Sequence, residues 1–234
     1  MERVDIAILI LLNDVVQRSP TLDVLLVYLL SNTPAKGLLF ASLMWWAWFR
    51  SAESKTTDRE VVISTLLAGA VSVSISQLLQ RLLPFRPRPV FLSALDLKIP
   101  YTGNAEPVLN LSSFPSDHAA FFYALAMGFW FLSRRLGTVL LVLVTVLICL
   151  PRLILGYHYP TDVIAGALIG FGTVYLIHAY VDIGPLSSIA KLWEQRSAGT
   201  LYMCFFILNY LIAAFFEPLR SLAKFIRSIV ATIT

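Results

Sequence analysis

Long apolar runs without charged residues alternate with polar connections along this chain. Val61–Leu79 and Val163–Val181 are long enough for a helix to cross a bilayer, which takes about 20 apolar residues. The runs Ala119–Ser133 and Leu136–Leu150 reach that length with their flanking residues, and Leu201–Phe216 forms a further run. Runs of this kind predict transmembrane helices.

A sixth apolar region, Val24–Phe49, contains a polar stretch around Pro34. It predicts one long broken helix, or a short entry segment followed by a spanning helix. The chain is therefore expected to be all-α, a polytopic membrane bundle of about six transmembrane helices. No internal repeat and no linker divides it, so we expect a single integral-membrane domain over residues 1–234.

Both ends of the chain have an amphipathic pattern. Within residues 1–18 the apolar positions follow helical spacing, which is typical of a segment that lies in the membrane interface. Acidic residues, and no small-residue cleavage site, argue against a signal peptide there. Glu2 and Asp5 are expected on the solvated face of this segment. Residues 218–234 form a second amphipathic segment, a tail with three basic side chains.

Composition supports the same interpretation. Hydrophobic residues make up 58% and charged residues 14% of the chain, whereas soluble domains hold about 45–50% and about 25%. These figures exclude an ordinary soluble domain, a disordered chain and a disulfide scaffold. Cys149 and Cys204 lie inside apolar runs and are expected to behave as small hydrophobic side chains. The net charge of +4 is modest for a membrane protein and does not favour a nucleic-acid partner.

Positive charge in the connections indicates the orientation in the membrane. Basic residues occur in 50–59, in the turn at 134–135 and in 182–200, and helix alternation puts these three connections on one face. The positive-inside rule makes that face cytoplasmic. The opposite face receives residues 80–115 and 151–162. Arginines in 80–115 and the basic tail run against this assignment, so the charge pattern alone leaves it open.

Candidate catalytic side chains gather on that opposite face. Ionisable residues close to a membrane are costly and rarely idle, so their concentration in three segments implies one shared site. Arg81, Arg88 and Arg152 offer forked, permanently charged donors that suit phosphate oxygens. Ser116, which follows a proline and precedes an apolar run, is expected to cap a helix whose free N–H groups form an anion site.

Two histidines and a carboxylate complete this set. Asp162 follows His158 by four residues and is placed to hold one ring nitrogen as N–H, which leaves the other nitrogen free to attack. His118, at the predicted start of a helix, is placed to donate a proton to a leaving oxygen. Arginines, a nucleophile, an orienting carboxylate and a proton donor together indicate a phosphoryl-transfer site.

These segments resemble the motifs of the phosphatidic acid phosphatase type 2 superfamily, which are Lys-x6-Arg-Pro, Pro-Ser-Gly-His and Ser-Arg-x5-His-x3-Asp. The chain matches them in order and spacing at Arg88-Pro89, at Pro115, Ser116 and His118, and at Arg152, His158 and Asp162. The resemblance implies a metal-independent lipid phosphatase that needs no cofactor. It also implies that His158 takes the phosphoryl group covalently, as a phosphohistidine, and that His118 protonates the leaving group.

Three positions depart from the family pattern. Arg81 stands where lysine is usual, Pro151 where a serine precedes the arginine, and Asp117 where glycine is usual. Asp117 favours a helix N-terminus but repels a bound phosphate unless an arginine pairs with it, so it is a candidate modulator of the site. Arg86 is a second candidate modulator, and a contact with solvent or lipid headgroups is its alternative role. The Pro-Ser-Asp-His form, preceded by Arg-Pro-Arg-Pro, resembles the bacitracin-resistance type of undecaprenyl pyrophosphate phosphatase.

The resemblance makes a polyprenyl pyrophosphate the expected substrate, with undecaprenyl pyrophosphate favoured, at the extracytoplasmic face of a bacterial inner membrane. Phosphatidylglycerol phosphate, phosphatidate, lipid A phosphates and phosphoryl transfer to a lipid acceptor stay open, as does the oligomeric state. The lipid phosphate and the bilayer are the expected partners. A transporter is disfavoured because the spans hold almost no charge, and a metal site because clustered arginines repel a divalent cation.

Overall fold

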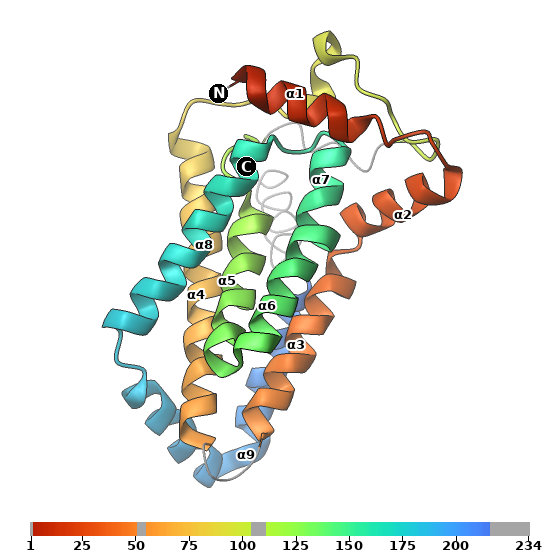
Figure 1. Ribbon diagram of the computed structural model, residues 1–234. Coiled ribbons are helices and arrows are strands. Elements are labelled where there is room, and N and C mark those ends of the chain that lie inside the picture. Colours follow the sequence, from red (N-terminus) through yellow and green to blue (C-terminus); the bar gives the residue numbers. More distant parts are fainter. Residues whose placement is uncertain (1, 51–54, 104–110, 216–234) are drawn as a thin grey trace, which may run out of the picture. The chain divides into compact units, whose positions relative to one another are not determined.

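Helices are the only regular secondary structure in the described part of the chain, where loops connect them. The computed structural model describes residues 2–50, 55–103 and 111–215, and these ranges contain helices and loops but no β-strand (Figure 1). In chain order the elements are α1 (Glu2–Asn13), α2 (Pro20–Ser31), α3 (Thr33–Phe49), α4 (Lys55–Leu82), η1 (Pro89–Phe91), η2 (Ser93–Leu95), α5 (Asp117–Leu132), α6 (Arg134–Leu143), the π-helix η3 (Val144–Cys149), α7 (Leu150–Ile154), α8 (Pro160–Tyr180) and α9 (Gly184–Ala213). The all-α prediction is confirmed.

Three helical stretches within the described ranges are long and apolar enough to cross a membrane. They are Asp58–Leu82, Arg134–Ile154 and Pro160–Tyr180, and the number rises to four if α2 and α3 count as one broken span. The apolar runs predicted within these stretches therefore form long helices. The polar stretch before Pro34 does interrupt its region, because α2 ends at Ser31 and α3 begins two residues later.

The chain forms two compact units. The first comprises residues 1–31 and 60–183, and the second comprises residues 32–59 and 184–234. In the first unit α5 packs along α8 and along α6 (Figure 1). Large side chains of α5 are fully buried, namely Phe121, Phe122 and Leu125. The candidate catalytic residues all belong to this first unit.

Two glycines on α8 allow this helix to approach α5 closely. A Cβ atom on Gly166 would lie 2.4 Å from the carbonyl oxygen of Ser116, and one on Gly170 would lie 2.5 Å from that of Ala120. Real Cβ atoms do not come so near to other atoms, so only glycine fits at these two positions without a shift. The Gly-x-x-x-Gly spacing is typical of close helix pairs in membranes. Because this contact reaches Ser116, it sets the start of α5 beside the start of α8.

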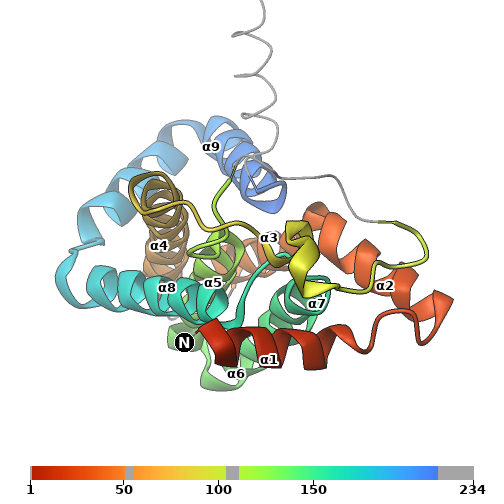
Figure 2. The same ribbon diagram turned by 90° about the horizontal axis from the view of Figure 1, so that it is seen from above.

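Helix α1 lies across the end of the first unit where α7 ends and α8 begins (Figure 1), and Figure 2 shows it flat on that end. Its buried face carries Asp5, Leu9 and Asn13, whereas Val4 and Leu11 are exposed. Asn13 anchors the helix, because its amide donates to the carbonyl of Ile154 at 2.9 Å and to that of Lys98 at 3.2 Å. Residues 2–13 of the predicted amphipathic segment form a helix, but the prediction that Asp5 is solvated is wrong, since Asp5 is only 2% exposed.

The second unit pairs α3 with the C-terminal part of α9. The rings of Trp48 and Phe205 lie 4.7 Å apart between their centroids, and Arg59 forms a two-pronged ion pair with Glu194 at 2.6 and 3.1 Å. The segment 182–200, predicted as a connection, is instead largely helical, and the helix is interrupted at Ser197, where the backbone leaves helical geometry. The charged residues of segment 182–200 interrupt its apolar spacing, so the amphipathic pattern is hard to see in the sequence. The predicted tail at 218–234 lies outside the described residues.

Candidate active site

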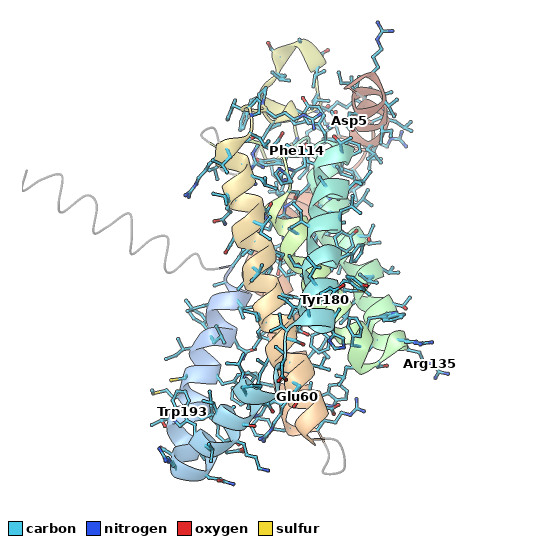
Figure 3. The ribbon with its side chains drawn as sticks, turned by 90° about the vertical axis from the view of Figure 1, so that its left-hand side faces the viewer. Asp5, Glu60, Phe114, Arg135, Tyr180 and Trp193 are labelled. Carbon is cyan, nitrogen blue, oxygen red and sulfur yellow. The ribbon has the colours of Figure 1, made fainter. Side chains whose placement is uncertain are left out.

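The three predicted motif segments meet at one end of the first unit. Figure 3 places Phe114 and Asp5 together at that end and Arg135 well away from it. Hydrogen bonds of the main chain join the segments: Ser113 N–H donates to Arg86 at 2.9 Å, Ser116 N–H to Asp162 at 3.0 Å, and Val90 N–H to Gly156 at 2.8 Å. The end of α4 is fixed to the same place, because the Gln80 amide donates to the carbonyl of Pro115 at 2.8 Å.

The ring of His158 is held at both nitrogens. Nδ1 lies 2.9 Å from the carbonyl oxygen of Ser113, which only accepts hydrogen bonds, so Nδ1 is the protonated nitrogen of the neutral ring. Nε2 lies 3.4 Å from Nη1 of Arg88, a group that only donates. Both neighbours therefore favour the same tautomer, in which Nε2 keeps its lone pair. The ring is 1% exposed.

Asp162 lies close to His158 but is not its nearest acceptor. Its Oδ2 atom is 3.6 Å from Nδ1 of His158 and accepts from the N–H of Tyr159 at 2.8 Å, which caps α8. Its Oδ1 atom accepts from Nη1 of Arg86 at 2.5 Å. The sequence placed Asp162 as the group that holds the histidine ring. In the structure the Ser113 carbonyl takes the hydrogen bond, and the buried carboxylate supplies negative charge beside it.

Arg86 forms its hydrogen bonds with protein groups, whereas the sequence left a contact with solvent or lipid headgroups as an alternative. Besides Asp162, it donates to Oδ2 of Asp5 at 2.8 Å and to the hydroxyl of Thr161 at 2.9 Å. Its guanidinium carbon lies 3.9 Å from the ring centroid of Tyr159. Two carboxylates, a hydroxyl and an aromatic face therefore hold this side chain in one position.

His118 has a carboxylate partner of its own. Its Nδ1 atom lies 2.9 Å from Oδ1 of Asp117, the same oxygen that accepts from the His118 backbone N–H at 2.8 Å. Asp117 is the first residue of α5, and Ser116 caps that helix by accepting from the N–H of Ala119, as predicted. His118 is partly exposed, with 20% of its side chain accessible, whereas His158 is buried.

The three predicted phosphate-binding arginines differ in their surroundings. Arg88 is 7% exposed and Arg152 4% exposed; Arg152 donates to the carbonyl of Ile148 at 3.0 Å, in the π-helical turn η3. The negative charge of Asp117, the first residue of α5, acts on both arginines. Arg81 lies on the last turn of α4, is exposed, and has no hydrogen bond or ion pair among the described residues.

Two buried polar atoms at the site have no hydrogen-bond partner among the described residues: Nε of Arg88 and Oγ of Ser113. An unpaired buried donor is costly, so such atoms are rare in folded proteins. Both lie next to His158, one on the residue that faces Nε2 and one on the residue that holds Nδ1. Arg88, the residue on the Nε2 side, therefore offers an unpaired N–H donor for an oxyanion at the site.

Burial and charge tune the groups outside the spanning helices. Burial lowers the pKa of His158, the Asp162 carboxylate opposes this, and the charge of Arg88 adds to it, so the net shift is downward. Burial also lowers the pKa of Arg88, although Asp117 and Asp162 oppose this shift. For Arg86 burial acts against the charge, but hydrogen bonds and charges from Asp5 and Asp162 outweigh it and raise the pKa. A neutral histidine thus faces arginines that stay protonated.

Within the described ranges, no group of three or more His, Cys, Asp and Glu side chains is arranged to hold a metal ion. The residues that are brought together instead match the needs of phosphoryl transfer: a neutral imidazole, a second imidazole on an open side, and fixed positive charge. Of the predicted residues, Arg81 alone forms no hydrogen bond or ion pair with the others in the described ranges.

Sequence reasoning missed three contributors to this site, namely Asp5, Ser113 and Thr161. Ser113 acts through its backbone carbonyl, which no side-chain pattern reveals. Asp5 and Thr161 are 156 positions apart in the sequence. Thr161 donates to Asp5 from its N–H at 3.1 Å and from its hydroxyl at 2.6 Å. One signal for Asp5 was available: it lies on the same helical face as Leu9, at a spacing of one turn.

Comparison with known proteins shows which family the chain matches. The family model described as PAP2 superfamily matches residues 59–183, which include every motif residue named above. The undecaprenyl-diphosphatase BcrC of Bacillus subtilis is 28% identical over 128 residues, which cover 55% of this chain and 62% of the length of BcrC. YbjG of Escherichia coli is 26% identical over 170 residues, covering 73% of this chain and 79% of YbjG.

Two further proteins extend the comparison. The lipid A 1-diphosphate synthase of Escherichia coli is 28% identical over 156 residues, covering 65% of this chain and 62% of that protein. The crystal structure of Aquifex aeolicus LpxE superposes with a TM-score of 0.50 at 25% sequence identity, and it covers 74% of this chain and 94% of LpxE.

Proposed function

This chain belongs to the PAP2 superfamily, and on that premise we propose that it is a membrane phosphatase that removes the terminal phosphate of a polyprenyl pyrophosphate, with undecaprenyl pyrophosphate favoured. One observation carries the proposal: Nδ1 of His158 faces the Ser113 carbonyl at 2.9 Å, so Nε2 keeps its lone pair beside the buried Arg88. A neutral, buried and oriented imidazole next to a guanidinium is the arrangement that nucleophilic attack on phosphorus requires. The similarity to the undecaprenyl-diphosphatase BcrC supports the choice of substrate.

In the first step Nε2 of His158 attacks the terminal phosphorus. The new P–N bond forms as the bond between that phosphorus and the bridging oxygen breaks, and the lipid monophosphate leaves. His118 donates its proton to the departing oxygen, for which its partly exposed position is suited. The carboxylate of Asp162, 3.6 Å from Nδ1, stabilises the positive charge that the ring of His158 acquires.

In the second step water hydrolyses the phosphohistidine. His118, now unprotonated, takes a proton from the attacking water, and the P–N bond breaks to release inorganic phosphate. His158 returns to its neutral form and His118 to its protonated form. Both histidines thus end the cycle in the state in which they began, so no cofactor and no further reactant are consumed.

Fixed donors stabilise the equatorial oxygens in both steps. Arg88 and Arg152 provide positive charge and hydrogen bonds, the helix dipole at the start of α5 adds positive potential, and the unpaired Nε donor of Arg88 adds a further hydrogen bond. Arg81, at the exposed end of α4, is assigned to the second phosphate of the diphosphate. This division gives the buried arginines the transition-state role and Arg81 a binding role.

The proposed site opens on the extracytoplasmic side of the membrane. Arg134 and Arg135 follow α5 directly, and α5 has 16 residues, so this positive pair lies about 24 Å from the site along the helix. The positive-inside rule assigns that far end to the cytoplasm. The terminal phosphate then projects from the outer leaflet while its prenyl chain stays in lipid.

Phosphate release from defined lipids tests the proposal. The purified protein in detergent, with excess chelator, is given undecaprenyl pyrophosphate, phosphatidylglycerol phosphate, phosphatidate and lipid A. We expect the highest kcat/KM with undecaprenyl pyrophosphate, and no release by His158→Ala. Substrate labelled at the terminal phosphate is expected to label the protein, but not the His158→Ala variant. Release that stays at wild-type level in His158→Ala excludes the nucleophile.

Transfer to a lipid acceptor is a second candidate reaction, favoured by the similarity to the lipid A 1-diphosphate synthase of Escherichia coli. It would use the same phosphohistidine with a lipid phosphate in place of water. The two reactions are separated by adding lipid A to the assay and following the label. Label that appears in lipid A rather than in inorganic phosphate identifies a transferase.

A further inference from the structure

Helix α1 reaches the catalytic carboxylate through one buried acid. Asp5 is 2% exposed, although it lies on the amphipathic helix at the edge of the unit. Its Oδ2 atom accepts from Nη2 of Arg86 at 2.8 Å and from the Thr161 hydroxyl at 2.6 Å, and its Oδ1 atom accepts from the Thr161 N–H at 3.1 Å. Both carboxylate oxygens are therefore used.

The contacts form a closed set around Arg86. The Thr161 hydroxyl accepts from Nη1 of Arg86 at 2.9 Å and donates to Asp5, so it bridges the two charged groups. The same Nη1 donates to Asp162 at 2.5 Å. Arg86 is thereby shared between a carboxylate beside His158 and a carboxylate on α1. Nothing in the reaction proposed above uses Asp5, which lies at the outer end of this set.

We propose that Asp5 is a positioning residue: through Arg86 and Thr161, it holds Asp162 in the place from which it stabilises the charge on His158. The inference rests on the proposed function, since it assigns Asp162 that role. Arginine is an effective phosphate ligand, and one carboxylate alone leaves half of its fork free. Asp5 occupies that second half, which keeps Arg86 on Asp162 and away from the substrate.

Through Asp5, α1 contributes to the active site and does not only pack against the end of the unit. Its buried face ends in Asn13, whose side chain is bonded, among the described residues, to the backbone of Ile154 and Lys98. Asp5 and Asn13 thus both dock the helix, but only Asp5 continues to the catalytic carboxylate. This difference provides a matched control on the same helix face.

The test compares Asp5→Asn with Asn13→Ala in the full chain, using undecaprenyl pyrophosphate in detergent. Asp5→Asn keeps the shape of the side chain and removes its charge. We expect its kcat to fall about 10- to 100-fold, as when an outer partner of a functional histidine is lost, with KM changed less than about twofold. Asn13→Ala is expected to lower the melting temperature and leave kcat unchanged.

A second pair of variants keeps the test valid if Asp5→Asn does not fold. Thr161→Val removes the bridging hydroxyl and is expected to lower kcat in the same way, whereas Thr161→Ser retains the hydroxyl and is expected to restore it. Wild-type kcat in Asp5→Asn, an equal loss in Asn13→Ala, or equal effects of Thr161→Val and Thr161→Ser would each overturn the inference. His158→Ala, measured alongside, separates the two proposals: activity in that variant rejects the proposed function, whereas its inactivity beside a fully active Asp5→Asn rejects only the role of Asp5.

Discussion

The Nδ1 atom of His118 lies 2.9 Å from Oδ1 of Asp117, the residue that immediately precedes it in the chain. Because a carboxylate only accepts hydrogen bonds, Nδ1 carries a proton and Nε2 is the nitrogen that exchanges a proton with the substrate. Asp117 therefore has a use that the sequence did not indicate. Its carboxylate accepts a hydrogen bond from the imidazole of His118, so its negative charge stabilises that ring.

Replacing Asp117 is expected to weaken the proton donor selectively. Asp117→Asn keeps the size of the side chain but removes the charge that orients and stabilises the His118 imidazolium. General acid catalysis is worth about 10²- to 10⁴-fold, so we expect kcat for a lipid diphosphate to fall by about 10- to 100-fold. A phosphate ester with a p-nitrophenolate leaving group needs no protonation, so the burst of p-nitrophenolate that reports the first step is expected to fall much less.

The control for this prediction is His158→Ala, which removes the nucleophile and is expected to abolish both reactions. His118→Ala is expected to follow Asp117→Asn in sparing the burst of p-nitrophenolate from the activated ester, which reports the first step alone, because the second step uses His118 as its base. An equal loss for the two substrates in Asp117→Asn would show that Asp117 acts on something other than proton donation.

The pH dependence is expected to report His158. Its unprotonated form is the nucleophile, and its pKa lies below the ordinary value because burial outweighs the nearby carboxylates. The acid limb of kcat/KM should therefore lie below about pH 6.5, the ordinary histidine value. Arg88→Gln removes a positive charge and is expected to move this limb to higher pH, whereas Asp162→Asn removes a negative charge and is expected to move it to lower pH.

Ionisation of the substrate phosphate occurs in a similar pH range, but it is common to all variants. Only the differences between the wild-type and variant profiles are therefore used. Shifts of the same sign in Arg88→Gln and Asp162→Asn would contradict the assignment of the limb to His158.

The fold was predictable where the sequence left the chain a single option. Uncharged runs such as 61–79 and 163–181 are too apolar to lie outside the membrane, so they had to form long helices. The prediction was wrong at 182–200, where charged residues interrupt the apolar pattern. Exposed apolar side chains at Leu186, Ile189 and Trp193 nevertheless follow helical spacing, and the segment is helical.

The candidate site was predictable in its side chains but not in their partners. His158, Arg88 and Asp162 lie within motifs of fixed spacing, and the roles proposed for them follow from charge and titration chemistry. Which group holds the His158 ring depends on a backbone carbonyl 45 positions earlier, and no local pattern encodes that contact. Asp5 was hidden for a related reason, since an acidic residue on an amphipathic helix normally faces water.

Arg88, which is buried, and Arg81, which is exposed, are expected to differ in their effect on catalysis. Arg88→Ala should lower kcat/KM by about 2–4 kcal/mol in transition-state stabilisation, the typical effect of losing one donor to a developing oxyanion. Arg88→Lys is expected to recover little, because a single ammonium cannot replace the fork. Arg81→Ala, on the exposed end of α4, should cost less than about 1 kcal/mol and appear in KM. Kinetics on a diphosphate substrate check the ranking, and an equal loss of kcat at Arg81 would contradict it.

The close contact between α8 and α5 is expected to depend on Gly170 but not on its neighbour Gly172. A Cβ at Gly170 would lie 2.5 Å from the carbonyl oxygen of Ala120, whereas one at Gly172 meets nothing within 4 Å. Gly170→Ala should therefore destabilise the protein by about 1–3 kcal/mol through overpacking, and lower kcat, because the starts of α5 and α8 carry His118 and Asp162. Gly172→Ala makes the same chemical change on the same helix and should be neutral or stabilise by about 0.5–1 kcal/mol, since alanine favours a helix over glycine. Melting temperatures in detergent, measured with phosphate release, decide the matter, and equal melting temperatures for the two variants would show that these helices do not pack through Gly170.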